Sequence, residues 1–96
     1  MNLQITARHF TLTEQLEELI NKEVEALEKH YDHIKEVNVV LTHNQTLHHV
    51  DVTVRVNSHT LTSEEESPER FVYLIPTVMK KATIQLQKHK EKLKKL

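Results

Sequence analysis

Residues 50–56 alternate strictly between valine and polar side chains, and this alternation constrains the fold more than any other feature of the chain. Successive side chains of a β-strand point to opposite faces, so the valines share one face and the polar residues share the other. A strand of this kind is typical of a sheet that is packed on one side and open to water on the other. The residues of the apolar face are Val50, Val52, Val54 and Val56.

Three other segments predict strands with the same one-sided pattern. Residues 2–8 and 37–42 alternate clearly, whereas residues 59–65 alternate more weakly. The chain has no glycine, so the tight turn before the last strand needs another residue that tolerates positive φ, and Asn57 can supply it. The inward-facing positions are predicted to be Leu3, Ile5, Ala7, Val37, Val39, Leu41, Leu61 and Ser63.

Two segments predict amphipathic helices, because apolar residues recur at helical spacing in residues 16–31 and again in residues 71–93. Thr11 or Thr13 can cap the first helix, and the apolar pattern favours a start after Thr13. The outer face of this helix is largely acidic. The apolar positions are Leu16, Leu19, Ile20, Val24, Leu27 and Tyr31 in the first helix and Phe71, Ile75, Met79, Ala82, Leu86 and Leu93 in the second.

Two prolines bear on the second helix. Ser67 is predicted to cap it, with Pro68 at the first helical position. Pro76 removes one backbone hydrogen bond, so the helix should either bend there or begin only near Thr77. A helix from residue 68 to 96 would be roughly 43 Å long, against about 20 Å for a six-residue strand. The last turns should therefore overhang the sheet.

The predicted order of elements is β-α-β-β-β-α, which indicates an α+β fold in a single domain of residues 1–96. We expect one four-stranded sheet with both helices packed on one face and a right-handed crossover between the first two, parallel strands. The chain has no cysteine, and no apolar run reaches membrane-spanning length. The N-terminus has no signal-peptide pattern, so we expect a cytoplasmic protein without membrane contact.

The net charge of −1 hides an uneven distribution along the chain. Residues 80–96 contain seven lysines and one glutamate, a net charge of +6. Residues 1–79 contain six Lys or Arg and thirteen Asp or Glu, a net charge of −7. A basic end on an acidic body indicates that this end binds an anionic partner. The alternative is that the basic end only attracts the acidic body or complements the helix dipole.

Four of these lysines are predicted to form a stripe on the last helix. On a helical wheel Lys81, Lys92 and Lys95 lie within about 40° of Lys88, opposite the apolar face. A line of lysines on overhanging turns suits a phosphate backbone, because phosphate contacts need no recognition of the bases. The chain has no glycine-rich phosphate loop and few aromatic residues, so neither that loop nor base stacking on the sheet is predicted.

The chain resembles the short bacterial ribosome hibernation promoting factors and the related ribosome-associated inhibitors, a sigma-54 modulation protein-like family. The similarity covers nearly the whole chain and is carried by HYDHIKEVNVVL (residues 30–41), HVDVTVRVNSH (49–59) and QLQKHKEKLKK (85–95). It implies a double-stranded-RNA-binding-domain-like fold. It also implies binding to rRNA in the small-subunit channel used by mRNA and tRNA, which keeps ribosomes inactive. The chain departs from the family at residues 70–76, where the family usually has two carboxylates and no proline.

The resemblance also implies individual RNA-binding positions. The run from Lys88 to Lys92 matches the terminal helix of the family, His33 falls where the family has Arg or His, and Lys22 and Lys29 lie near basic positions of the first helix. Any pairing of ribosomes would require a second hibernation factor. With the other lysines of the basic end, the predicted RNA-binding residues are Lys22, Lys29, His33, Lys80, Lys81, Lys88, His89, Lys90, Lys92 and Lys95.

Other kinds of function are less well supported. The alternative is a protein-interaction or anionic-surface-binding module that uses the basic C-terminal amphipathic helix, although residues 80–96 lack the Trp and Phe of a membrane-inserting helix. The eight histidines form no zinc motif, so we expect solvated loop histidines at His43, His48 and His49, and no metal or cofactor. The acidic run of residues 64–66 is interpreted as solvated charge, and we expect no enzymatic activity.

Overall fold

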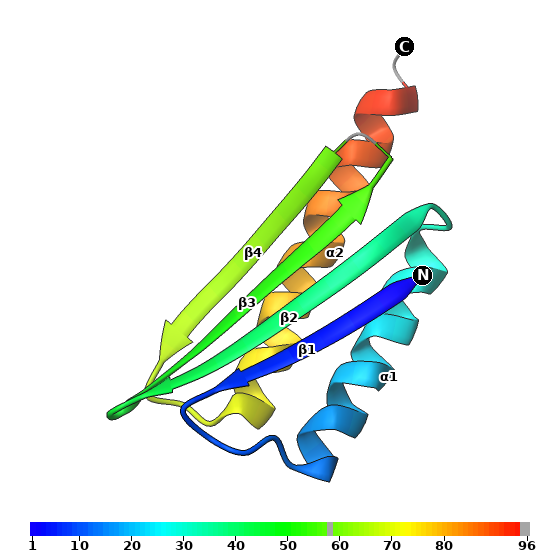
Figure 1. Cartoon of the computed structure of the whole chain (residues 1–96). Helices are drawn as coiled ribbons and strands as arrows, with labels where there is room; N and C mark the ends of the chain where they lie inside the picture. Colours follow the sequence, from blue (N-terminus) through cyan, green and yellow to red (C-terminus); the bar gives the residue numbers. More distant parts are fainter. Residues whose placement is uncertain (58, 95–96) are drawn as a thin grey trace.

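Four strands form one sheet in the spatial order β1-β2-β3-β4, and both helices cover the same face of it (Figure 1). The structure, a computed structural model, describes residues 1–57 and 59–94 and the side chains of residues 1–57 and 59–90. The predicted β-α-β-β-β-α order and α+β class are confirmed. The bounds are Asn2–Arg8 for β1, Glu14–His30 for α1, Ile34–Asn44 for β2, Leu47–Val56 for β3, His59–Ser67 for β4 and Phe71–Lys94 for α2.

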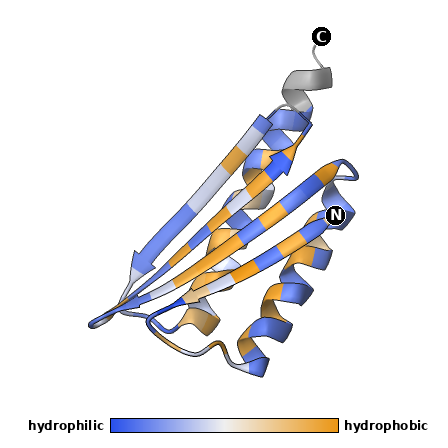
Figure 2. Cartoon of the chain, in the orientation of Figure 1, coloured by the Kyte–Doolittle hydropathy of each residue, from blue (hydrophilic) through white to orange (hydrophobic). Residues whose placement is uncertain are grey.

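The one-sided pattern of the strands is confirmed. β1 runs parallel to β2, whereas β3 is antiparallel to both β2 and β4. Val37 lies opposite Val54, and Val39 lies opposite Val52, so the alternating valines meet on the covered face, where each is at most 1% exposed. Figure 2 shows apolar and polar residues alternating along β2 and β3. The other face of the sheet is left open.

The apolar faces of the two helices close the core from one side. The stripe predicted for α2 is confirmed from Phe71 to Leu86, and Leu93 lies beyond the described side chains. Leu74 and Val78, which lie outside the predicted stripe, are buried as well. The buried helical residues are Ile20, Val24 and Leu27 in α1 and Phe71, Leu74, Ile75, Val78, Met79, Ala82 and Leu86 in α2.

Thr13, not Thr11, is the N-cap of α1. Its backbone is extended, with φ of −86° and ψ of 156°, and its Oγ1 accepts a hydrogen bond from the backbone N–H of Leu16 at 3.2 Å. The first helical N–H groups have no partner within the helix, so a side-chain oxygen at this position satisfies one of them. The preference of the apolar pattern for a start after Thr13 is confirmed.

Replacing Thr13 with alanine should lower the free energy of unfolding by about 1 kcal/mol, because the cap is lost and the N–H of Leu16 is left to water. Urea denaturation followed by circular dichroism measures this change. Thr11→Ala is the matched control and should leave the stability nearly unchanged. Equal losses in the two variants would contradict the assignment of the cap.

The predicted start of the second helix at Ser67 and Pro68 is wrong. β4 continues to Ser67, which pairs with His48 of β3, and α2 begins only at Phe71. Pairing with β3 keeps the backbone of Ser67 extended, and its Oγ accepts a hydrogen bond from the N–H of Glu69 at 3.1 Å in the turn that follows.

At the other end of β4, Asn57 has a φ of 30°, which confirms its predicted role as the positive-φ residue of the turn before this strand.

Pro76 lies inside α2, so the alternative in which the helix begins only near Thr77 is wrong. Proline has no N–H to donate, which leaves the carbonyl of Val72 without its helical partner. Val72 is 42% exposed, so water can reach this part of the helix. The neighbouring turn is supported by Thr77, whose Oγ1 donates to the carbonyl of Tyr73 at 3.2 Å. A bend at Pro76 stays a prediction.

The last turns of α2 project beyond the ends of the strands, as the length of the helix had predicted (Figure 1). The end of α1 and the starts of β2 and β4 lie at this same end of the molecule. In the described part of the chain, neither helix has the length and apolar character needed to cross a bilayer.

Candidate nucleic-acid interface

α2 carries four exposed lysines whose side chains the structure describes: Lys80, Lys81, Lys88 and Lys90. Lys80 and Lys88 lie on the side of the helix away from its buried face, where Met79 is 3% and Leu86 1% exposed. Lys90 lies about 160° from Lys88 around the helix and is exposed at the other flank of the buried face. Lys80, Lys88 and Lys90 are therefore accessible to an outside partner. Of the other predicted lysines of this helix, Lys92 lies beyond the described side chains and Lys95 lies outside the described residues.

Lys81 differs from the other lysines because it has partners within the chain. Its Nζ donates to the backbone carbonyl of Glu64 at 3.3 Å and forms an ion pair with the carboxylate of Glu65, both on β4. The predicted stripe from Lys81 to Lys88 is therefore not uniformly free for phosphate contacts. The side chains of Lys81 and Glu65 are 47% and 33% exposed, so this pair contributes at most about 1 kcal/mol to stability.

One helical turn further on, Gln85 continues this contact with β4. Its amide nitrogen donates to the carbonyl of Thr62 at 2.9 Å and to Oγ of Ser63 at 3.1 Å. β4 is an edge strand, and the backbone acceptors of such a strand are open to pairing with another chain unless something covers them. Side chains of α2 occupy two of these acceptors and so tie the helix to the edge of the sheet.

A row of four aromatic rings connects the ends of α1, β4 and α2. His33 meets Tyr31 edge-on with ring centroids 5.8 Å apart, Tyr31 lies 6.3 Å from His89, and His89 lies 4.7 Å from His59. His89 is half-buried. The structure thus brings the predicted residues His33 and His89 to one end of the molecule.

Lys88 lies at that same end. It lines a shallow hollow of ≈ 180 Å³ together with His59, Leu61, Gln85 and His89. A lysine beside partly exposed imidazole rings can contact an anion through charge and through hydrogen-bond donation at the same place.

The predicted residues of α1, Lys22 and Lys29, have acidic neighbours on their own helix. Lys22 and Lys29 are exposed, on the side of α1 away from the sheet. Each has a glutamate four residues before it on the same helical face, Glu18 and Glu25, an arrangement that offsets part of its positive charge. The structure therefore supports Lys22 and Lys29 as anion contacts less strongly than the lysines of α2.

Two exposed residues of α2 were missed as site candidates. Tyr73 is 61% and Ile84 is 43% exposed, and both lie on the outward arc of the helix near Lys80. A ring and an aliphatic chain beside a lysine can pack against the sugar and base portions of a nucleic acid while the lysine contacts phosphate. Their positions on the helical wheel, away from the apolar stripe, could have revealed them in the sequence.

The expectation that His43, His48 and His49 are solvated loop histidines is wrong, because all three lie in strands and are half-buried. His43 and His48 lie opposite each other on β2 and β3, with rings stacked at 4.6 Å and an interplanar angle of 3°. His48 also meets Phe71 edge-on at 4.7 Å, and its buried Nδ1 has no hydrogen-bond partner. These rings lie at the edge of the core, near the N-terminal ends of the helices. His48 also lines an open hollow of ≈ 490 Å³ there, together with Arg70 and Phe71.

These features define the class of the protein: a small α+β domain in which a lysine-bearing helix lies along the edge of an open-faced sheet. The model of the family described as Sigma 54 modulation protein / S30EA ribosomal protein matches residues 3–94. The chain belongs to this family.

Relatives with curated names match along the whole chain. The ribosome hibernation promoting factor of Escherichia coli (strain K12) is 34% identical over 94 residues, which cover 98% of each protein. The ribosome hibernation promoting factor of Azotobacter vinelandii is 26% identical over 92 residues, which cover 96% of this chain and 85% of that protein.

Two solved structures share the fold. The structure of a ribosomal subunit interface protein from Coxiella burnetii has a TM-score of 0.87 and 24% identity, and the match covers 95% of this chain and 99% of that one. The N-terminal domain of Protein Y from Thermus thermophilus has a TM-score of 0.81 and 18% identity, with coverage of 93% and 99%. The four-stranded sheet with two helices is therefore the fold of these proteins as well.

Proposed function

We propose that this chain is a ribosome hibernation factor that binds rRNA of the small subunit through the outward face of α2. In this proposal it occupies the channel for mRNA and tRNA and keeps the ribosome inactive in the cytoplasm. The observation that carries the proposal is the match along residues 3–94 to a family whose curated relatives are named for ribosome hibernation.

The charges on the surface support the proposed mode of binding. Lys80, Lys88 and Lys90 are exposed on one helix, whereas the outward face of α1 is rich in glutamate. Lysines that contact phosphates release counterions and do not read the base sequence, which suits a fixed site on rRNA. The acidic α1 would be repelled by the same phosphates, so the molecule should bind with α2 toward the RNA.

Competition with the natural occupants of the channel tests this proposal. Purified small subunits, either empty or preloaded with a messenger and initiator tRNA, are sedimented with the chain at one salt concentration. Empty subunits should carry the chain into the pellet, and preloaded subunits should bind at least tenfold more weakly, because the same space and phosphates are already occupied.

Equal binding to empty and preloaded subunits would show that the chain associates with ribosomes outside the channel. Vesicles containing anionic lipid are the comparison for the alternative function. Binding to such vesicles without binding to either ribosome sample would favour a general anionic-surface module and would overturn the proposed function.

A further inference from the structure

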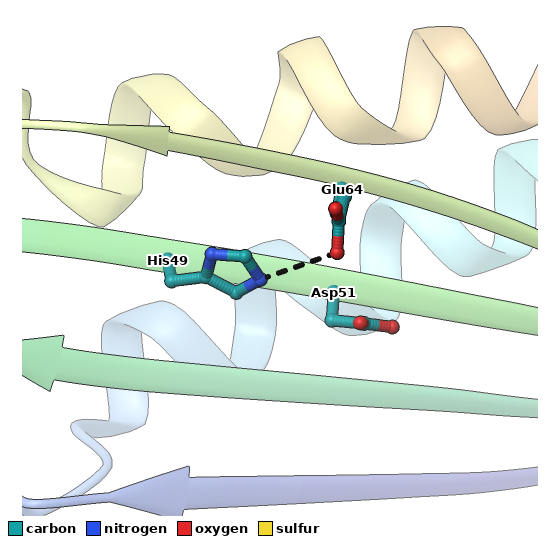
Figure 3. A group of neighbouring side chains, drawn as sticks. All are labelled: His49, Asp51 and Glu64. Carbon is teal, nitrogen blue, oxygen red and sulfur yellow. Dashed lines mark ion pairs between the residues drawn. The ribbon is translucent and has the colours of Figure 1, made fainter.

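A histidine and three carboxylates gather on the open face of the sheet, on the side opposite to α2. His49 and Asp51 are two residues apart on β3 and so share this face, and β4 places Glu66 opposite His49 and Glu64 opposite Asp51. Ligand atoms of His49, Asp51 and Glu64 all lie within 4.8 Å of one another (Figure 3). Among the side chains that the structure describes, this is the one group of three or more that could hold a metal ion.

The register of the strands places two carboxylates side by side on this face of the sheet. Asp51 and Glu64 are directly opposite each other on neighbouring strands, and like charges in that position destabilise a sheet. Figure 3 shows the ring of His49 pointing toward Glu64, with Nε2 3.6 Å from the carboxylate oxygen Oε2. A divalent cation between the three side chains would remove the repulsion while the strands keep their pairing.

Glu66 contacts the other nitrogen of the same ring. Its Oε2 lies 3.4 Å from Nδ1 of His49. A metal-ligating histidine almost always donates its second ring N–H to an acceptor such as a carboxylate, which fixes the tautomer and the orientation of the ring. In a metal site of this kind the Nδ1 proton would face Glu66, and Nε2, directed toward Glu64, would be the nitrogen that binds the ion. Glu66 would then orient the imidazole.

The distances suit a small ion with nitrogen and oxygen ligands. Two ligands that each lie about 2.1 Å from Zn²⁺ at a tetrahedral angle are about 3.4 Å apart. The 3.6 Å between Nε2 of His49 and Oε2 of Glu64 is close to this value. The half-buried Asp51 completes the group, because one oxygen of its carboxylate lies within 4.8 Å of the ligand atoms of His49 and Glu64, and it would move closer to them on binding an ion.

We propose that His49, Asp51 and Glu64 bind one Zn²⁺ ion on the open face of β3 and β4, with Glu66 orienting the imidazole. An imidazole ligand favours zinc and its transition-metal neighbours over Mg²⁺ and Ca²⁺, which prefer oxygen ligands. Three protein ligands leave a position for water or for a group from outside. The bound ion joins the edge strand β4 to β3 through side chains, in addition to their backbone ladder.

Calorimetric titration of the full chain with zinc chloride, without ribosomes, tests this site independently of the proposed function. The parent should bind one equivalent, and His49→Gln should lose it. Glu66→Gln should retain the site but bind about 10- to 100-fold more weakly, because only the orienting carboxylate is lost. His30→Gln is the matched control, an exposed histidine of α1 remote from the cluster, and should bind like the parent.

Two-dimensional NMR of backbone amides locates the ion and verifies that each variant is folded. Zinc should shift the amides of residues 49–51 and 64–66 in the parent and in His30→Gln. Asp51→Asn gives a second, nearly isosteric variant if His49→Gln proves unfolded, and it should also lose tight binding. Zinc binding by folded His49→Gln or Asp51→Asn with parental affinity, or shifts centred elsewhere, would overturn the proposal.

Discussion

Replacing Lys80 and Lys88 together with glutamine should lower the slope of log affinity for the small subunit against log salt by about 1.4 to 1.8, since each phosphate contact contributes about 0.7 to 0.9. Binding should weaken most at low salt. Between 50 and 200 mM salt, the loss of affinity should be about 7- to 12-fold smaller for the variant than for the parent. Co-sedimentation across a salt series measures the slope, and circular dichroism verifies the fold, which should survive because both side chains are exposed.

Lys81→Gln is the matched control on the same helix. Its Nζ is engaged by Glu64 and Glu65, so the slope should change by less than the amount expected for one full contact. A second control, the replacement of Glu17 and Glu18 with glutamine, should leave binding unchanged or strengthen it slightly by removing repulsion. If the Lys80 and Lys88 variant binds like the parent at every salt concentration, these lysines are only solvated and α2 is not the binding face.

Replacing Leu86 with alanine should lower the free energy of unfolding by about 2 to 5 kcal/mol, because the substitution leaves a cavity in a packed core. Leu86 is 1% exposed and lies in the part of α2 that covers the sheet next to the lysines. A domain of this size has a total stability of only about 5 to 15 kcal/mol, so much of it would be lost. Urea denaturation of both proteins at one temperature measures the difference.

Ile84→Ala is the control for this prediction. Ile84 lies two residues away on the same helix and is 43% exposed, so its loss should change stability by less than about 0.5 kcal/mol. The comparison holds helix propensity and side-chain size nearly constant and varies only burial. Similar losses in the two variants would show that the end of α2 is not packed on the sheet as described.

The strands could be predicted because their signal is local. A period of two places Val50 and Val52 on the same face whatever the rest of the chain does, and the structure confirms it. The start of α2 could not be predicted in this way. Ser67 and Pro68 form a good helix start, but the pairing of Ser67 with His48 holds the residue in β4, and a pairing between distant segments leaves no local signal.

The candidate interface was predictable only in part for the same reason. Helical spacing correctly placed Lys81 and Lys88 away from the core. It could not show that Glu65, sixteen residues away, engages Lys81, because that contact depends on α2 lying along β4. The grouping of His49 with Glu64 likewise follows from strand register and matches no short motif. The contacts of all ten predicted residues with RNA stay predictions.

The attachment of α2 to β4 limits how far the sheet can grow. A fifth strand from another molecule would have to pair with the outer carbonyls of β4, and those of Thr62 and Glu64 are already hydrogen-bonded to Gln85 and Lys81. An incoming chain would first have to displace two side chains and a helix whose other face is part of the core. On this side the chain itself terminates its sheet, so copies of the protein gain little by pairing their strands through β4.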